Sequence, residues 1–92
     1  MAEHLEMTLF VLNKLGLHAR AAAKIAATAQ EYQASITLER NGLQADARSI
    51  LDILGLGCAQ GSEVTLRAHG PEAQTAAAAI AELFRQAFGE TI

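Results

Sequence analysis

The sequence predicts an α+β fold in which helices pack on one face of an antiparallel sheet. Segments with a period of two and segments with helical periodicity follow one another as strand, helix, strand, strand, helix, strand, helix. Two of the strands meet at Asn41-Gly42, a pair that favours a tight hairpin turn because both residues tolerate positive φ. Strict strand-helix-strand alternation is absent, so the pattern is α+β. A chain of 92 residues fits a single domain spanning 1–92.

The composition of the chain argues against several classes of protein. The formal net charge of −3 argues against a nucleic-acid binder. No segment approaches the ~20 apolar residues of a membrane span. Cys58 is the single cysteine, and His4 and His69 have no companions at metal-ligand spacing. We therefore expect a cytoplasmic protein with no disulfide, no resident metal and no cofactor.

The first half of the chain predicts a strand and a helix. Met1 to Leu5 is expected to fray, and the strand is expected over Leu5–Leu12, where apolar residues alternate. The helix is expected from about Ala19 to Tyr32. Its buried stripe has the spacing i, i+3, i+4, i+7 and comprises Ala22, Ile25, Ala26 and Ala29.

The middle of the chain predicts a hairpin followed by a short helix. Strands are expected over Ala34–Arg40 and Leu43–Ala47. Ser49-Ile50-Leu51-Asp52 has the form of a capping box with Asp in place of Glu, so a helix should begin at Ile50. Gly55 and Gly57 should end it within about two turns.

The last third predicts a strand over Glu63–Ala68 and a final helix. We expect Pro71 in the first turn of this helix and Glu72 at its positive end. Gly89 should end the helix, which then runs to about Phe88. Its buried stripe is expected to comprise Ala77, Ile80, Ala81, Phe84 and Phe88.

The candidate site lies between the first strand and the first helix. His18 falls at the helix entrance, where backbone N–H groups lack intrahelical partners and the helix dipole is positive. Such a terminus binds anions. Arg20 adds a guanidinium that can donate two hydrogen bonds to a phosphate. An imidazole, free N–H donors and a guanidinium at one point suit a histidine that carries a phosphoryl group.

Two motifs in this chain resemble a known family. Gly16-Leu17-His18-Ala19-Arg20 is similar to the active-site signature of HPr, the histidine-containing phosphocarrier of the bacterial phosphoenolpyruvate-dependent phosphotransferase system. Ala47–Leu56 is similar to the regulatory-serine segment of the same family. The resemblance extends from about Met7 to Phe88. It implies an open-faced β-sandwich of order βαββαβα, with a four-stranded antiparallel sheet and three helices on one face.

The resemblance implies a role for His18, and the chemistry of the neighbouring residues predicts roles for them. His18 would accept a phosphoryl group on Nδ1 from phosphorylated enzyme I and pass it to enzyme IIA-type acceptors. Arg20 and the N–H of Ala19 would hold the phosphoryl oxygens. Gly16 would permit the sharp helix entry, and Asn13 would hydrogen-bond across the loop. The protein would be a monomeric substrate in a relay, not an enzyme, and Mg²⁺ would belong to enzyme I.

One position departs from the family pattern. Many HPr proteins have proline directly after the arginine of the motif, and this chain has Ala21. Alanine here also occurs in family members, including the nitrogen-related branch, NPr. The sequence therefore leaves open whether the carrier serves sugar uptake or nitrogen-type regulation.

A second functional region is expected around the short helix. Ser49 serves as a helix N-cap, and the resemblance implies phosphorylation of this serine by HPr kinase/phosphorylase. Ile50, Leu51 and Leu54 cannot all be buried on so short a helix. We interpret them as a docking patch for protein partners, surrounded by basic residues that would steer acidic partners. The surrounding residues are Arg20, Lys24 and Arg48, and Lys14 is a further lysine expected to steer partners.

Two functions of other classes compete with the phosphocarrier. One is a purely regulatory binding module that acts through Ser49 and the patch, against which the presence of His18 with Arg20 counts. The other is a small-molecule-binding α+β domain, as in amino-acid-sensing modules. The sequence shows no ligand-pocket signature for that function.

Overall fold

The computed structural model describes residues 3–92 as a four-stranded antiparallel sheet with three α-helices, and it confirms the predicted fold class. Met1 and Ala2, part of the segment expected to fray, lie outside the described residues. The strands lie in the order β1-β4-β2-β3. The elements are β1 (Glu3–Phe10), α1 (Ala19–Ala29), β2 (Ser35–Arg40), β3 (Leu43–Asp46), α2 (Ile50–Gly55), β4 (Glu63–Gly70), α3 (Ala73–Arg85) and the 3₁₀ helix η1 (Ala87–Gly89).

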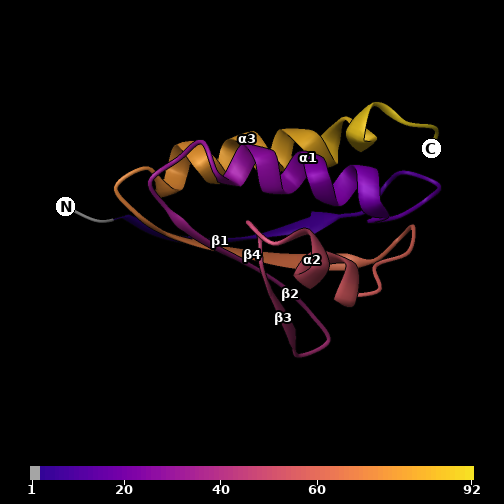
Figure 1. Ribbon diagram of the computed structural model, residues 1–92, viewed down its shortest axis with the longest axis horizontal. Coiled ribbons are helices and arrows are strands. Elements are labelled where there is room, and N and C mark those ends of the chain that lie inside the picture. The colour runs from indigo at the N-terminus through magenta and orange to yellow at the C-terminus, as the bar shows by residue number, and fades with distance from the viewer. Residues whose placement is uncertain (1–2) are drawn as a thin grey trace.

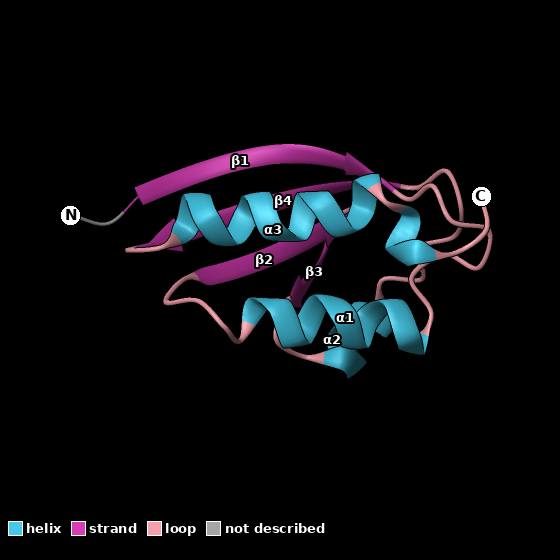
Figure 2. Ribbon diagram, turned by 90° about the horizontal axis from the view of Figure 1, so that it is seen from above, coloured by secondary structure: helices cyan, strands magenta, loops and turns pink. Residues whose placement is uncertain are grey.

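The helices form a layer on one face of the sheet. Helices α1 and α3 run side by side above the strands, and α2 lies next to α1 on the side away from α3 (Figures 1 and 2). The loop before α1, the loop before β4 and the C-terminal segment meet at one end of the molecule (Figure 1). Within residues 3–92, no helix has both the length and the apolar character needed to cross a membrane.

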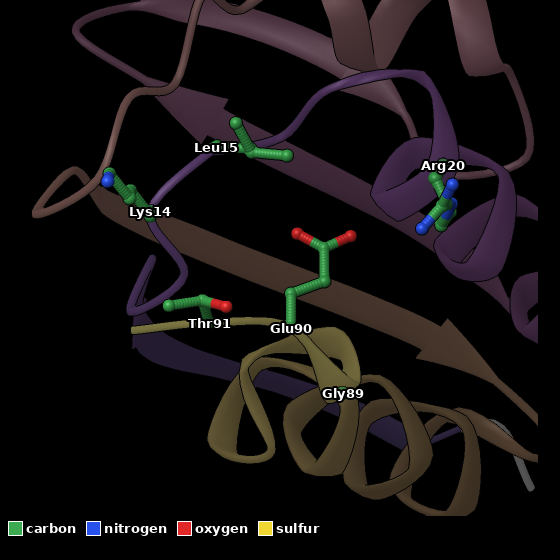
Figure 3. Close-up of a pocket in the computed structure, with 6 residues that line it drawn as sticks. All are labelled: Lys14, Leu15, Arg20, Gly89, Glu90 and Thr91. Atoms are coloured by element: carbon green, nitrogen blue, oxygen red, sulfur yellow. The ribbon is translucent and has the colours of Figure 1, made fainter.

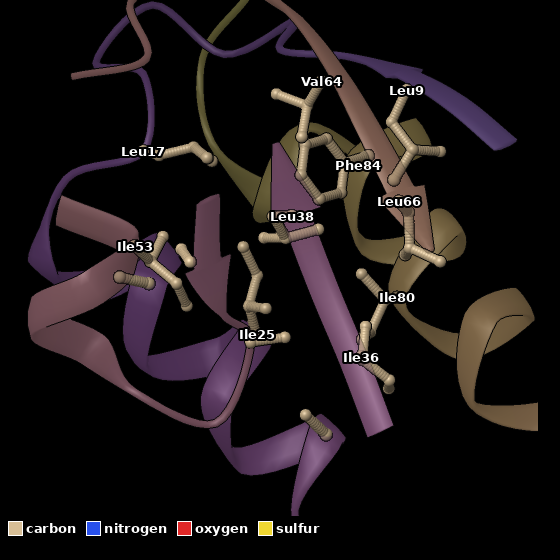
Figure 4. Close-up of a cluster of buried hydrophobic side chains, with 14 of the residues drawn as sticks. Leu9, Leu17, Ile25, Ile36, Leu38, Ile53, Val64, Leu66, Ile80 and Phe84 are labelled. Carbon is tan, nitrogen blue, oxygen red and sulfur yellow. The ribbon is translucent and has the colours of Figure 1, made fainter. Parts of the chain in front are cut away.

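The core lies between the sheet and the helix layer. Leu38 of β2 is at its centre, and side chains from all three helices surround it (Figure 4). The predicted stripes of both long helices are buried, apart from the half-buried Ala81. Many of these residues are alanines, which let α1 and α3 approach the sheet and each other closely. The alternation predicted for β4 is also confirmed, with Val64, Leu66 and Ala68 buried.

Several element ends differ from the predictions. Strand β1 begins at Glu3 and β4 extends to Gly70, because these two residues pair at the end of the ladder. Helix α1 ends at Ala29 instead of Tyr32. Its last turn tightens there, since Tyr32 N donates to the carbonyl three residues back.

At the start of the last helix, the prediction was wrong for Pro71 and is confirmed for Glu72, which lies at the positive end. Glu72 is the N-cap of α3, so Pro71 precedes the helix. Glu72 is held by the turn after α1: its N–H donates to the Gln33 carbonyl at 3.0 Å, and its carboxylate accepts from Gln33 N at 2.7 Å. The helix also ends at Arg85, because Ala87 and Phe88 adopt positive φ and form η1.

Half of the predicted capping box is formed at α2. Ser49 Oγ accepts a hydrogen bond from Asp52 N at 3.2 Å, as expected. The reciprocal bond is replaced, because Ser49 N donates to the Asp46 carbonyl at 2.9 Å. The Asp52 carboxylate accepts from Asp46 N instead.

The loop before α1 is packed tightly against the loop before β4. Leu17 N donates to the Cys58 carbonyl at 2.9 Å. Gly16 has φ +70°, and a Cβ at this position would lie 2.4 Å from the Cys58 carbonyl oxygen. Glycine is therefore required here by its conformation and by the space available.

We predict that Gly16→Ala destabilises the protein more than Gly57→Ala. Gly57 has a similar φ of +64°, but a Cβ there would meet nothing within 4 Å. The control should cost about 1–2 kcal/mol for the left-handed conformation alone. Gly16→Ala would also push its Cβ against the Cys58 backbone. It should therefore lower the free energy of unfolding by at least about 1 kcal/mol more than the control does. Urea denaturation measures the unfolding free energy of each variant. Equal losses of stability would contradict the close contact between Gly16 and Cys58.

Candidate functional site

His18 is the N-cap residue of α1. Its backbone is extended (φ −78°, ψ −177°), and its carbonyl accepts the first helical hydrogen bond from Ala22 N at 2.9 Å. The ring nitrogen Nδ1 accepts a long hydrogen bond of 3.4 Å from Arg20 N. Nδ1 therefore faces the positive end of the helix dipole and the N–H groups of the first turn.

The other ring nitrogen contacts a carboxylate from the C-terminal segment. His18 Nε2 lies 2.6 Å from Glu90 Oε2, and the two side chains are 27% and 11% exposed. A carboxylate accepts, so this contact assigns the proton of a neutral ring to Nε2 and the lone pair to Nδ1. The available lone pair thus lies on the nitrogen at the helix N-terminus.

Glu90 is stabilised as a carboxylate at this position. Burial raises the pKa of Glu90, but hydrogen bonds from Asn13 and His18 and the positive charges of His18 and Arg20 outweigh this effect. The net result is a pKa below the usual value. A negative charge is therefore maintained beside the His18 ring at neutral pH.

A surface pocket of about 470 Å³ lies next to this pair. The Glu90 carboxylate projects into the space between Leu15 and Arg20 (Figure 3). The pocket brings the basic side chains of Lys14 and Arg20 to the same opening. Its lining residues are Lys14, Leu15, Arg20, Gly89, Glu90 and Thr91.

Asn13 joins the loop before α1 to Glu90. Its side chain is fully buried, and Nδ2 donates to the Gly16 carbonyl at 2.7 Å and to Glu90 Oε1 at 3.0 Å. The hydrogen bond expected across the loop is present, and a second one reaches the C-terminal segment. One amide group thus holds both the helix entry and the carboxylate.

The small residues of the motif have different environments. Ala19 is exposed at the first position of α1, so its backbone N–H lies in the anion-binding first turn. Ala21, which follows Arg20 directly, is fully buried.

The basic residues expected around the docking patch are not all placed there. Lys24 Nζ donates to the Phe88 carbonyl at 2.6 Å, on the side of α1 that faces α3 and η1. It therefore lies across α1 from α2. Arg48 lies near α2, and its guanidinium donates to the Tyr32 carbonyl at 2.9 Å.

The three apolar residues of the patch are exposed on α2. Leu51 is 80% exposed, whereas Ile50 and Leu54 are about half as exposed and Ile53 is fully buried. Ser49 is half-buried at the cap of this helix. The short helix thus presents an apolar surface beside a serine hydroxyl.

Sequence reasoning missed Glu90. It lies 72 residues from His18, and no spacing in the sequence connects the two. The single available signal was an acidic residue directly after Gly89, the expected helix end. Among residues 3–92, no group of three or more His, Cys, Asp or Glu side chains is arranged to hold a metal ion.

Comparison with known proteins identifies the family. The family model described as "PTS HPr component phosphorylation site" matches residues 5–86. The chain is 42% identical over 86 residues to the phosphocarrier protein HPr of Xylella fastidiosa (strain 9a5c), covering 94% of this chain and 97% of that one. It is also 42% identical over 86 residues to the phosphocarrier protein NPr of Shewanella violacea, covering 94% of each.

A solved structure supports the same assignment. HPr from Thermoanaerobacter tengcongensis superposes with a TM-score of 0.91 and 38% identity, covering 96% of this chain and 99% of that one. These matches cover nearly the whole chain, including the loop that carries His18. The chain therefore belongs to the HPr family, whose members are phosphocarrier proteins of the phosphotransferase system and not stand-alone enzymes.

Proposed function

We propose that His18 accepts a phosphoryl group on Nδ1 from phosphorylated enzyme I and passes it to enzyme IIA-type acceptors. The observation that carries this proposal is the orientation of the ring. Nε2 is held by Glu90, which leaves the Nδ1 lone pair at the N-terminus of α1. The carrier acts as a monomeric, one-domain protein in the cytoplasm.

The transfer needs one bond to form and one to break. The Nδ1 lone pair of His18 attacks phosphorus, and the bond from phosphorus to the donor nitrogen breaks with its electron pair returning to the donor. The proton on Nε2 stays in place, so the ring gains positive charge as the phosphoryl group arrives. Transfer to the acceptor reverses these changes.

The residues around His18 bind the phosphoryl oxygens. The backbone N–H groups of Ala19 and Arg20 lie in the first turn of α1, and the exposed Arg20 guanidinium can move to meet the new charge. Phosphoryl transfer depends mainly on positioning and charge stabilisation, which these groups supply. Nothing in this mechanism requires a metal ion on the carrier itself.

Partners dock on the exposed patch of Ile50, Leu51 and Leu54. A transient interface needs an apolar centre with charged residues around it. Arg48 supplies basic charge near the patch, and Lys14 and Arg20 supply it at the pocket. Acidic partner surfaces would be steered to His18 by these charges.

The comparisons leave both branches of the family open. Relatives named HPr and relatives named NPr match this chain at the same identity. The buried Ala21 replaces the common proline and is compatible with either branch. Phosphorylation by a sugar-type or a nitrogen-type enzyme I distinguishes them.

We predict that wild type gains one acid-labile phosphate when incubated with phosphoenolpyruvate, Mg²⁺ and enzyme I, and that His18→Ala gains none. The product should be stable in base, as a phosphohistidine is. Intact mass and ³¹P NMR measure both properties. Each type of enzyme I is used in turn, and the faster donor assigns the branch.

The alternative of a purely regulatory module makes the opposite prediction. In that case wild type stays unmodified with both donors, and partners bind through Ser49 and the patch alone. Circular dichroism of His18→Ala serves as the folding control, because this partly exposed side chain is not part of the core.

A regulatory role for Ser49 is the second part of the proposal. HPr kinase/phosphorylase would phosphorylate the hydroxyl that caps α2. The phosphate would then lie beside the exposed patch on which partners dock, and its charge would repel their acidic surfaces. Phosphorylation of Ser49 would thus slow transfer through His18.

We predict different effects for two Ser49 variants. Ser49→Ala removes the cap and should cost about 1 kcal/mol of unfolding free energy while transfer continues. Ser49→Asp should slow phosphorylation by enzyme I at least about tenfold, which corresponds to about 1.4 kcal/mol of repulsion. Ser35→Asp, which adds the same charge at the start of β2, is the control for transfer kinetics. Equal rates for the two Asp variants would contradict the regulatory role.

A further inference from the structure

The contact between His18 and Glu90 is held from both sides of Glu90. We define residues 86–91, the chain after α3, as the C-terminal strap. Before Glu90, the Phe88 carbonyl accepts from Lys24 Nζ at 2.6 Å. After Glu90, the Thr91 carbonyl accepts from Lys14 N at 2.8 Å. Helix α1 and the loop before it therefore both hold the strap.

The strap keeps a conformation that a free chain would avoid. Ala87 and Phe88 have φ of +53° and +56°, and two consecutive non-glycine residues in this region are strained. Burial holds them, since both side chains are nearly inaccessible and the Phe88 ring packs edge-on against Phe84. The strap is thus an ordered segment that orients the Glu90 side chain toward His18.

We propose that Glu90 is a positioning residue for phosphoryl transfer. The C-terminal strap, anchored by Lys24, places the Glu90 carboxylate beside His18. There the carboxylate holds the proton on Nε2 while Nδ1 carries the phosphoryl group. This inference rests on the proposed function of His18. It extends that function by assigning roles to Glu90 and Lys24.

The role follows from the charges that form during transfer. Once phosphorus is bonded to Nδ1, the ring that still carries its Nε2 proton is cationic. In this state the electron pair of the P–N bond can return to a neutral ring when phosphorus leaves. A carboxylate 2.6 Å from Nε2 favours the cationic form and so maintains the reactive phosphohistidine at higher pH.

The other charged groups around Glu90 do not supply this effect. Lys14 and Arg20 line the same pocket and are both cations. Arg20 stabilises the Glu90 carboxylate, and both cations can bind the phosphoryl oxygens, but both disfavour positive charge on the ring. Asn13, which donates to Glu90 Oε1, is neutral. Glu90 supplies the negative charge that offsets these cations.

The test measures the pH profile of phosphohistidine hydrolysis with no partner protein present. Wild type, Glu90→Gln and the control Glu31→Gln are phosphorylated with phosphoramidate, a small-molecule donor. Glutamine still accepts a hydrogen bond from Nε2 but has no charge. Glu31→Gln makes the same change in net charge in the turn after α1, at the other end of that helix.

We expect the profile of Glu90→Gln to move to lower pH by about 1 unit, the effect of one close opposite charge. The profile of Glu31→Gln should superpose on that of wild type. Coincident profiles for all three proteins would overturn the inference. Failure of phosphoramidate to label His18 in wild type would instead defeat the proposed function of this residue.

Lys24 provides a second test of the strap. Lys24→Met keeps the side-chain stem but removes the donor to the Phe88 carbonyl, so the profile should move in the same direction by a smaller amount. A lysine that only steers partners has no effect in this assay, because no partner is present. An unchanged profile for Lys24→Met would contradict its anchoring role.

Discussion

Backbone packs directly on backbone where Gly16 meets Cys58. The Cys58 carbonyl accepts a hydrogen bond from Leu17 N and occupies the space that a Cβ on Gly16 would need. This contact fixes the loop before α1 against the loop before β4. The position of His18 depends on it, because His18 follows Leu17 directly and begins the helix.

Around this contact the site is assembled from distant parts of the chain. Helix α1 supplies the N-terminus and Arg20, the loop before it supplies Asn13, and the C-terminal strap supplies Glu90. Each segment reaches the site because its own element packs on the sheet at the same end of the molecule (Figure 1). The helix layer therefore serves stability and function together: the packing of α1 beside α3 brings Glu90 to His18.

The parts of the fold that follow local rules could be predicted from the sequence. The alanine-rich stripes, the Asn41-Gly42 turn and the Ser49 cap depend on periodicity and on neighbouring residues. The ends of α3 could not be predicted, because they depend on the distant Gln33 at one end and on buried residues with positive φ at the other. The same limit applies to the site. His18 and Arg20 adjoin a helix signal, whereas Glu90 is connected to them through space alone.

The location of the strap determines where this protein can be modified for study. Glu90 contacts His18, so a label attached within the strap would disturb the segment that orients the histidine. Strand β1 begins at Glu3, at the opposite end of the sheet (Figure 1). Labels and surface attachment therefore belong at that opposite end, where they leave the histidine and its approaches unobstructed.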